Sequence, residues 1–121
     1  MTIQPIPGAF SICQAARDTP IDFACPYVFV GVTDEEVSLV CPTDRVPAGV
    51  LRRDVGWRLS LCRVPDFSLV GILAEASAVL ARRRIGLFAV STFNRSYLFV
   101  KQGAFEQALA ALAEAGYTID R

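Results

Sequence analysis

Residues 57–101 constrain the fold of this chain most strongly, because they read in succession as a strand, a helix and a hairpin. Residues 57–64 and the two halves of 85–101 are rich in the β-branched and aromatic side chains that favour strands. Between them, apolar residues recur at i, i+3, i+4 and i+7 from Leu69 to Leu80, which is typical of one face of an amphipathic helix. A strand, a crossover helix and a hairpin make up most of a βαββαβ unit.

The ends of this helix, predicted over residues 66–84, carry signals of their own. Asp66 or Ser68 can cap its start, because a short side-chain oxygen accepts a hydrogen bond from the free backbone N–H groups there. Three arginines, residues 82–84, stand at its end and complement the helix dipole.

A second helix is predicted after residue 102, with Gly116 near its C-terminus and a last short strand at 117–119. Its apolar residues repeat at helical spacing: Phe105, Ala108, Leu109 and Leu112.

The first half of the chain predicts a shorter version of the same order of elements. Residues 1–9 contain prolines and are expected to be irregular, and 9–15 form a candidate strand. Residues 16–26 read as a loop, and 27–41 read as a hairpin with strands at its two ends. Residues 42–56 hold two prolines and two glycines and are expected to form a linker.

The two halves resemble a diverged repeat. Residues 11–14 (SICQ) match 60–63 (SLCR), and the hairpin around Thr33 matches the hairpin around Thr92. The second half has a full helix where the first has only a loop, which accounts for the different spacing of the two matches. The sequence therefore predicts two domains, a trimmed unit over 1–55 with its linker and a complete unit over 56–121.

The composition indicates which classes of binding partner the chain is expected to have. The chain has 121 residues, 53% of them hydrophobic, and its 12 basic and 12 acidic side chains balance to zero net charge. The sequence has no stripe of basic residues that would bind nucleic acid. A chain that is apolar and has no net charge tends to associate with itself, so we expect a homodimer. No apolar run approaches the roughly 20 residues that span a bilayer, and the start lacks a signal peptide, so we expect a cytoplasmic protein without membrane contact.

The residue types also bear on catalysis and cofactors. The chain has no histidine, and its cysteines, at 13, 25, 41 and 62, form no C-x-x-C pair. Zinc and iron–sulfur sites rely on close thiolate or imidazole clusters, so no metal or other cofactor is expected. No G-x-S-x-G, P-loop or G-x-G-x-x-G pattern is present, and we expect the chain not to be an enzyme.

Two short stretches are candidate binding sites. The loop before the predicted helix, around Asp66 and Phe67, would offer helix N–H groups to a carboxylate or phosphate. Simple capping by Asp66 or Ser68, with Phe67 in the core, explains the same residues. Residues 91–94 offer hydroxyls and an amide at a strand end, although ordinary turn chemistry explains them equally well. In a βαββ order both stretches lie near the same end of the sheet.

At this point the residues point to a family. GWR at 56–58, DFSLVGILA at 66–74 and IGLFAVSTF at 85–93 resemble small tandem ACT-domain proteins related to the regulatory region of aspartate kinase, and SLVCP at 38–42 fits the first half. The resemblance implies an α+β fold of two ferredoxin-like ACT-type units in tandem, often dimerised, and likeness to cytosolic arginine sensors. It implies an amino acid or small carboxylate as ligand, facing these residues: Asp66, Phe67, Ser68, Leu69, Val70, Ser91, Thr92, Phe93 and Asn94.

The chain departs from the family pattern at both stretches. Residues 63–65 (RVP) precede Asp66 where the family has Gly-Pro-Leu, and 94–97 read NRSY where the family has D-T-D-Y. Two carboxylates are replaced and Arg95 is added. The resemblance then implies a non-catalytic, allosteric binding module, either for a ligand with a second carboxylate or with its pocket lost. If the pocket is lost, the chain would be an interaction module. An enzyme similar to acylphosphatase is disfavoured, because such an enzyme binds phosphate in this loop and the carboxylate of Asp66 would repel it.

Overall fold

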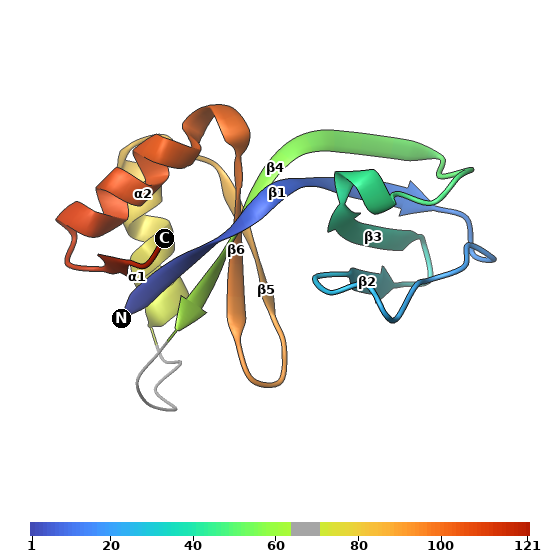
Figure 1. The fold of residues 1–121 in the computed structure, drawn as a ribbon, viewed down its shortest axis with the longest axis horizontal. Coiled ribbons are helices and arrows are strands. Elements are labelled where there is room, and N and C mark those ends of the chain that lie inside the picture. Colours follow the sequence, from blue (N-terminus) through green and yellow to red (C-terminus); the bar gives the residue numbers. More distant parts are fainter. Residues whose placement is uncertain (64–70) are drawn as a thin grey trace. The chain divides into compact units, whose positions relative to one another are not determined.

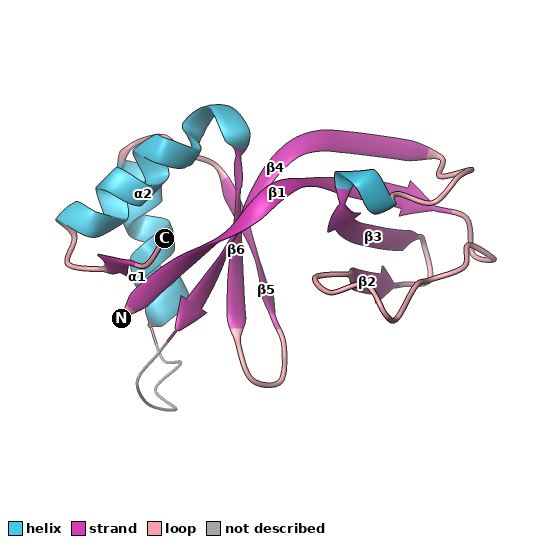
Figure 2. Cartoon of the chain, viewed as in Figure 1, coloured by secondary structure: helices cyan, strands magenta, loops and turns pink. Residues whose placement is uncertain are grey.

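The computed structural model describes residues 1–63 and 71–121 of the chain, which form an α+β fold with an antiparallel sheet and two helices in the described residues (Figures 1 and 2). The elements follow in this order: β1 (Thr2–Ala15), β2 (Phe29–Val32), β3 (Val37–Pro42), the 3₁₀ turn η1 (Thr43–Arg45), β4 (Arg52–Arg63), α1 (Ile72–Arg82), β5 (Leu87–Ser91), β6 (Ser96–Lys101), the 3₁₀ turn η2 (Gln102–Ala104), α2 (Phe105–Glu114) and β7 (Thr118–Ile119). Neither described helix is long and apolar enough to cross a membrane.

The chain divides into two compact units. Residues 1–7 and 58–121 form one, called here the helical unit because it contains α1 and α2. Residues 8–57 form the other, called the loop-covered unit. Strands β1 and β4 each run through both units, so the helical unit is built from two separate stretches of sequence and the loop-covered unit from one.

In the helical unit the strand order is β7-β1-β4-β6-β5, and both helices lie on one side of these strands (Figure 1). Strands β5 and β6 form the predicted hairpin, paired from Leu87↔Val100 to Ser91↔Ser96. The second helix and the last strand also form where the sequence predicts them. The core between sheet and helices is built from apolar residues of every element in the unit, including Ile3, Cys62, Leu80, Leu98, Phe105, Leu109 and Tyr117.

Helix α1 is described from Ile72, after Gly71 in a left-handed conformation, so the predicted caps Asp66 and Ser68 lie outside the described residues. Its C-terminus is a Schellman motif. Arg84 adopts φ 59°, its N–H donates to the Ala81 carbonyl, and the N–H of Ile85 donates to the Leu80 carbonyl at 3.0 Å. The helix therefore ends at Arg82 rather than at Arg84.

The expectation that residues 1–9 are irregular is wrong, because β1 begins at Thr2 and includes Pro5 and Pro7. The carbonyls of Met1 and Ile3 accept hydrogen bonds from Thr118 and Asp120. Backbone groups alternate in direction along a strand, so both prolines face this same edge, past the end of β7. Their missing N–H groups therefore cost no hydrogen bond to β7, which is how prolines are tolerated in strands.

Two other predicted boundaries are wrong as well. Residues 52–56, expected in a linker, are the first part of β4, and η1 occupies 43–45 of the same stretch. Strand β2 begins at Phe29 rather than at Tyr27, because Tyr27 has φ 64° and cannot continue an extended strand.

The loop-covered unit has the strand order β2-β3-β1-β4, without a helix beyond η1. Strands β1 and β3 pair from Phe10↔Pro42 to Ala15↔Val37, and β2 pairs with β3 as the predicted hairpin. Its small core contains Cys13, Leu39 and Cys41. The loop between β1 and β2 supplies Ile21 and Val28, which pack on this core.

The hairpins of the two units share one pair of turn hydrogen bonds. In β2–β3 the N–H and hydroxyl of Thr33 both donate to the Glu36 carbonyl, at 2.9 and 3.3 Å. In β5–β6 the N–H and hydroxyl of Thr92 donate to the Arg95 carbonyl, at 2.8 and 3.2 Å. Each hairpin is followed directly by a 3₁₀ turn, η1 or η2. The correspondence of Thr33 with Thr92 suggested by the sequence thus extends to their hydrogen bonds.

Candidate functional site

The structure places four of the predicted ligand-facing residues, 91–94, on the exposed hairpin turn of the helical unit. Ser91 is the last residue of β5, and Phe93 is fully exposed. The Thr92 hydroxyl donates to the Arg95 carbonyl, and Arg95 Nη1 donates to the Asn94 carbonyl at 2.9 Å. Turn chemistry therefore uses the Thr92 side chain, and the cationic side chain of Arg95 is held over the same turn.

The other predicted residues, Asp66, Phe67, Ser68, Leu69 and Val70, lie outside the described residues. The structure describes both ends of that stretch. Arg63 closes β4, and its Nε donates to Gln4 Oε1 at 2.9 Å; Gly71 begins the turn into α1. That residues 66–70 and 91–94 form one site stays a prediction.

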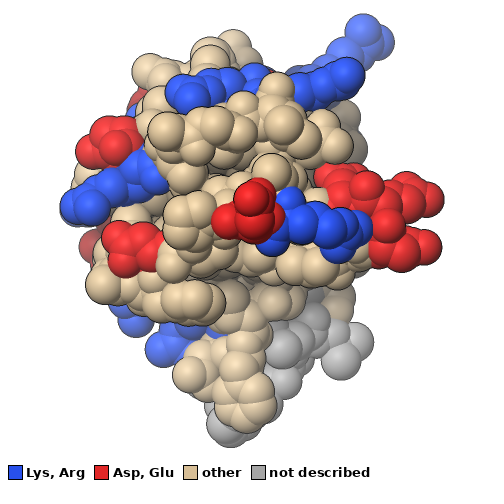
Figure 3. All heavy atoms as spheres, turned by 90° about the vertical axis from the view of Figure 1, so that its right-hand side faces the viewer, with Lys and Arg blue, Asp and Glu red and all other residues tan. Residues whose placement is uncertain are grey.

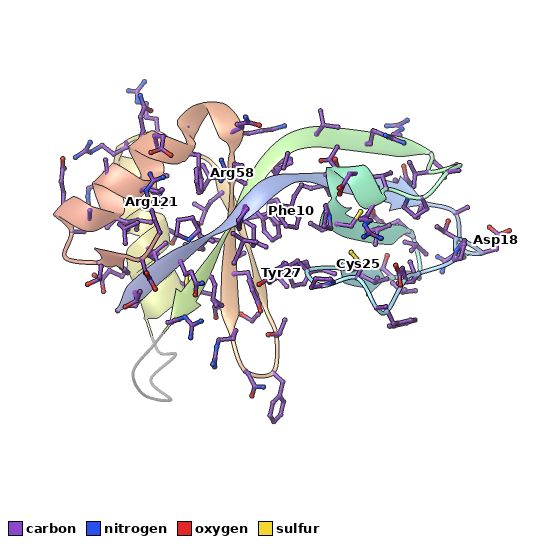
Figure 4. The ribbon with its side chains drawn as sticks, in the orientation of Figure 1. Phe10, Asp18, Cys25, Tyr27, Arg58 and Arg121 are labelled. Carbon is purple, nitrogen blue, oxygen red and sulfur yellow. The ribbon has the colours of Figure 1, made fainter. Side chains whose placement is uncertain are left out.

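A pocket lies elsewhere, within the loop-covered unit, and sequence reasoning missed it. It has a volume of about 330 Å³. It opens between the β1–β2 loop, strand β3 and the stretch around η1, and Figure 4 shows Cys25 on the loop near β3. Its lining residues are Pro20, Ile21, Asp22, Cys25, Val28, Leu39, Cys41, Arg45 and Pro47. The one signal in the sequence was the loop at 16–26, which stands where the second half has a helix.

Three of the four cysteines belong to this region, and two of them, Cys13 and Cys41, are buried. Burial, together with the neighbouring Cys13 and Cys25, raises the pKa of the Cys41 thiol to about 11 against a smaller opposing effect of Arg53. Burial also raises the pKa of Cys13, although Arg53 partly offsets the effect. Both thiols therefore stay protonated at neutral pH. Among the described residues, no group of histidine, cysteine or acidic side chains is arranged to hold a metal ion.

Aromatic packing fixes one end of the β1–β2 loop. Tyr27 meets the buried ring of Phe10 edge to face, with centroids 6.5 Å apart and an interplanar angle of 76° (Figure 4). Such contacts are worth about 0.5–1.5 kcal/mol beyond burial. The left-handed backbone of Tyr27 turns the chain from this contact into β2. The loop that roofs the pocket is therefore anchored where it joins the sheet.

A smaller cleft of about 190 Å³ lies between the ends of α1 and α2 in the helical unit. Arg83 and Glu114, both half exposed or more, form an ion pair across it. The pair neutralises the charges of Arg83 and Glu114, and Arg82 lines the same cleft. Deeper in the same unit, the Arg58 guanidinium lies 4.2 Å from the centre of the Phe105 ring (Figure 4).

On the face that Figure 3 shows, surface charge gives no strong preference for a ligand of either sign. Figure 3 views the molecule from the side where the turns of the loop-covered unit lie in Figure 1. Acidic and basic side chains are interspersed on this face, apart from one group of carboxylates (Figure 3). A ligand approaching it meets charges of both signs.

Comparison with known proteins identifies the family to which the chain is similar. The sequence model of the ACT domain matches residues 63–114. These residues run from the end of β4 through α1, the β5–β6 hairpin and α2. No curated protein sequence gives a significant match.

Solved structures share the fold over nearly the whole chain. Protein Atu0741 from Agobacterium tumefaciens is 30% identical, with a TM-score of 0.86 over 98% of this chain and 91% of that one. Protein VC0802 from Vibrio cholerae is 19% identical, with a TM-score of 0.76 over 93% of this chain and 88% of that one. The aspartate kinase of Clostridium acetobutylicum is 14% identical, with a TM-score of 0.66 over 93% of this chain and 34% of the kinase.

Proposed function

This chain is a member of the ACT-domain family, and from that membership we propose that it is a non-catalytic regulatory module that binds an amino acid or a small carboxylate. The observation that carries the proposal is the family match over residues 63–114. ACT domains are regulatory modules that bind small molecules. Binding here would shift the packing between units or between chains, which is the two-state change that allostery requires.

The proposed ligand site combines residues 66–70 with the exposed turn at 91–94. The turn supports it with polar groups at a strand end and with Arg95, whose Nη1 is oriented by the Asn94 carbonyl. A guanidinium has five N–H donors, so this bond leaves further donors for a carboxylate of the ligand. The cation in place of the family's acidic residues favours a ligand with a second carboxylate.

The proposal includes two ACT-type units in tandem, over 1–55 and 56–121, with the first trimmed. Matching hairpins support it, because Thr33 and Thr92 make the same pair of turn hydrogen bonds. Matching strands support it too. Ser11 and Ser60 are both buried, and so are Cys13 and Cys62, two residues further along in each case. Identical burial at equivalent positions is expected of a diverged duplication.

The protonation of the Cys41 and Cys62 thiols supports a role without catalysis. Burial raises the pKa of Cys62 to about 11, as it does for Cys41, so neither supplies a thiolate near neutral pH. The sequence has no histidine to act as their base. The cytoplasmic location expected from the sequence stays a prediction.

The alternative is an interaction module, in which the ligand pocket has decayed and a homodimer or another protein uses the surface. Exposed apolar side chains favour it: Phe93 on the β5–β6 turn is fully exposed, and Val32 on β2 is 66% exposed. Strands β2 and β5 lie at the ends of the strand order, so each has an edge for further pairing.

A thermal-shift screen of the purified chain against the twenty amino acids and common dicarboxylic acids tests the proposal. A ligand at 100 times its Kd should stabilise the fold by about 2.7 kcal/mol, which raises Tm measurably. The shift should be lost in Asp66→Ala and in Asn94→Ala. The control is Asp34→Ala, which changes the equivalent turn of the other hairpin.

Each outcome decides between the two functions. A selective shift that survives in Asp34→Ala but not in Asn94→Ala supports the sensor. A flat response from a folded sample, with a concentration-dependent dimer in sedimentation, rejects it in favour of the interaction module.

A further inference from the structure

We propose that the pocket of the loop-covered unit is a second, separate binding site, which takes a small zwitterion with an apolar body, such as an aliphatic α-amino acid. Every residue that lines it lies within 20–47. It therefore shares no residue with the site proposed at 66–70 and 91–94, and it does not depend on that site.

The floor of the pocket is apolar. Leu39 and Cys41 come from β3 and are 2% and 1% exposed. Ile21 and Val28 come from the β1–β2 loop and pack against the same small core. The raised pKa of Cys41 keeps its thiol neutral. A hydrocarbon side chain that displaced water from this floor would gain about 25 cal/mol for each Å² of apolar surface buried.

The mouth of the pocket carries one charge of each sign. Arg45 ends η1 and Asp22 lies in the β1–β2 loop, and both residues are exposed. Within the described residues, no ion pair joins these two side chains. A ligand carboxylate suits the guanidinium of Arg45, and a ligand ammonium suits the carboxylate of Asp22. The pairing favours a zwitterion over a simple acid, which Asp22 would repel, and over a simple amine, which Arg45 would repel.

Hydrogen bonds within the β1–β2 loop orient the Asp22 side chain. Asp22 Oδ1 accepts a hydrogen bond from the Ala24 N–H at 2.9 Å, and the Asp22 carbonyl accepts one from the Cys25 N–H at 3.3 Å. One carboxylate oxygen is thus fixed by the backbone, which directs the side chain before a ligand arrives. Preorganisation of this kind lowers the entropy lost on binding.

The volume sets the size of the occupant. A pocket of about 330 Å³ lies at the lower end of the range for small-molecule sites. Such a space is large enough for a ligand with a handful of carbon atoms. The absence of a helix over 16–28 is what leaves the space open, since the loop covers the sheet only through residues such as Ile21 and Val28.

The test uses the intact chain, L-leucine as the probe, and two analogues that each lack one charge. Isothermal titration should show binding of L-leucine and at least about ten-fold weaker binding of 4-methylpentanoate and of 3-methylbutylamine, because each loses a charge-assisted hydrogen bond. Amide NMR signals of residues 20–28 and 39–47 should shift on titration, whereas those of 91–95 should not.

Two conservative variants and two matched controls locate the contacts. Arg45→Gln and Asp22→Asn should each weaken L-leucine about ten-fold or more, and Asp22→Asn keeps the oxygen that accepts from Ala24. Arg52→Gln and Asp44→Asn remove exposed charges outside the lining and should leave the Kd unchanged.

The results also separate this proposal from the first. Leucine binding that is unchanged in Asn94→Ala but weakened in Arg45→Gln supports the second site, whatever the first site binds. Lack of L-leucine binding by the folded chain at 10 mM overturns the proposal. An affinity for either analogue equal to that for L-leucine, or shifts confined to residues 91–95, overturns it as well.

Discussion

At the scale of single residues, the cysteines show how position rather than residue type decides chemistry. Cys13 and Cys62 sit at equivalent positions of the repeated S-x-C segment, and both are buried. Their thiols are buried like small apolar side chains, and burial adds a pH dependence that composition alone does not reveal. Burial penalises the thiolate in the folded state but not in the unfolded chain.

The consequence is a loss of stability in alkali. The pKa of Cys41 and Cys62 rises from an unfolded value of 9.0 to about 11 on folding. Their stabilisation is fully present below pH 9 and falls by about 1.4 kcal/mol per pH unit for each thiol between pH 9 and 11. Urea titrations at several pH values measure it. Cys62→Ala should flatten the slope relative to the wild type over this range, and an unchanged slope would contradict the assignment.

At the scale of elements, the two helices end in the same Schellman motif with different residues at its left-handed position. In α2 this residue is Gly116, with φ 101°, and the Tyr117 N–H donates to the Leu112 carbonyl at 3.0 Å. In α1 it is Arg84, with φ 59°. A side chain in this conformation costs roughly 1 kcal/mol that glycine avoids. The end of α1 is therefore strained where the end of α2 is not.

Relief of this strain is measurable. Arg84→Gly should raise the free energy of unfolding by about 1 kcal/mol, because glycine adopts positive φ freely. Arg84→Ala is the matched control, since it removes the same side chain but keeps a Cβ, and it should give no such gain. Gly116→Ala should destabilise by about 1 kcal/mol. Equal stability of the two Arg84 variants in urea titrations would show that φ at this position carries no strain.

At the scale of the whole molecule, strands β1 and β4 each contribute residues to both units, and the helical unit combines two stretches that lie far apart in sequence. Residues 1–7 belong to the helical unit although 50 residues of the other unit follow before Arg58. Ile3 is fully buried in the core beneath the helices, together with Phe105 and Leu109. The helical unit therefore depends on the first residues of the chain.

A substitution at the N-terminus tests this dependence. Ile3→Ala should lower the free energy of unfolding by about 2–5 kcal/mol, the range for removing a buried Ile side chain. Thr2→Ala, next along the strand and only partly buried, should change it by less than about 1 kcal/mol. A small effect of Ile3→Ala in thermal or urea unfolding would mean that residues 1–7 are peripheral.

Local periodicity was enough to predict most of the fold. The apolar spacing around Leu80, the Thr92 turn and the helix from Phe105 identified the strand–helix–hairpin–helix–strand order, because those patterns depend on neighbours within a few residues. The resemblance of the same residues led to the ACT-domain family. For the candidate site, the sequence supplied residues 66–70 and 91–94, of which the structure describes only the second group, as an exposed turn.

What the tertiary structure alone decided depends on distant partners. Pro5 and Pro7 read as strand breakers, and only their position past the end of β7 makes a strand there permissible. The pocket is lined by Asp22 from a loop, Leu39 from a strand and Arg45 from a 3₁₀ turn. The spacing of these residues along the chain does not predict that they lie around one pocket. Periodicity reports which face of an element is buried, whereas pairing across a sheet decides which residues meet.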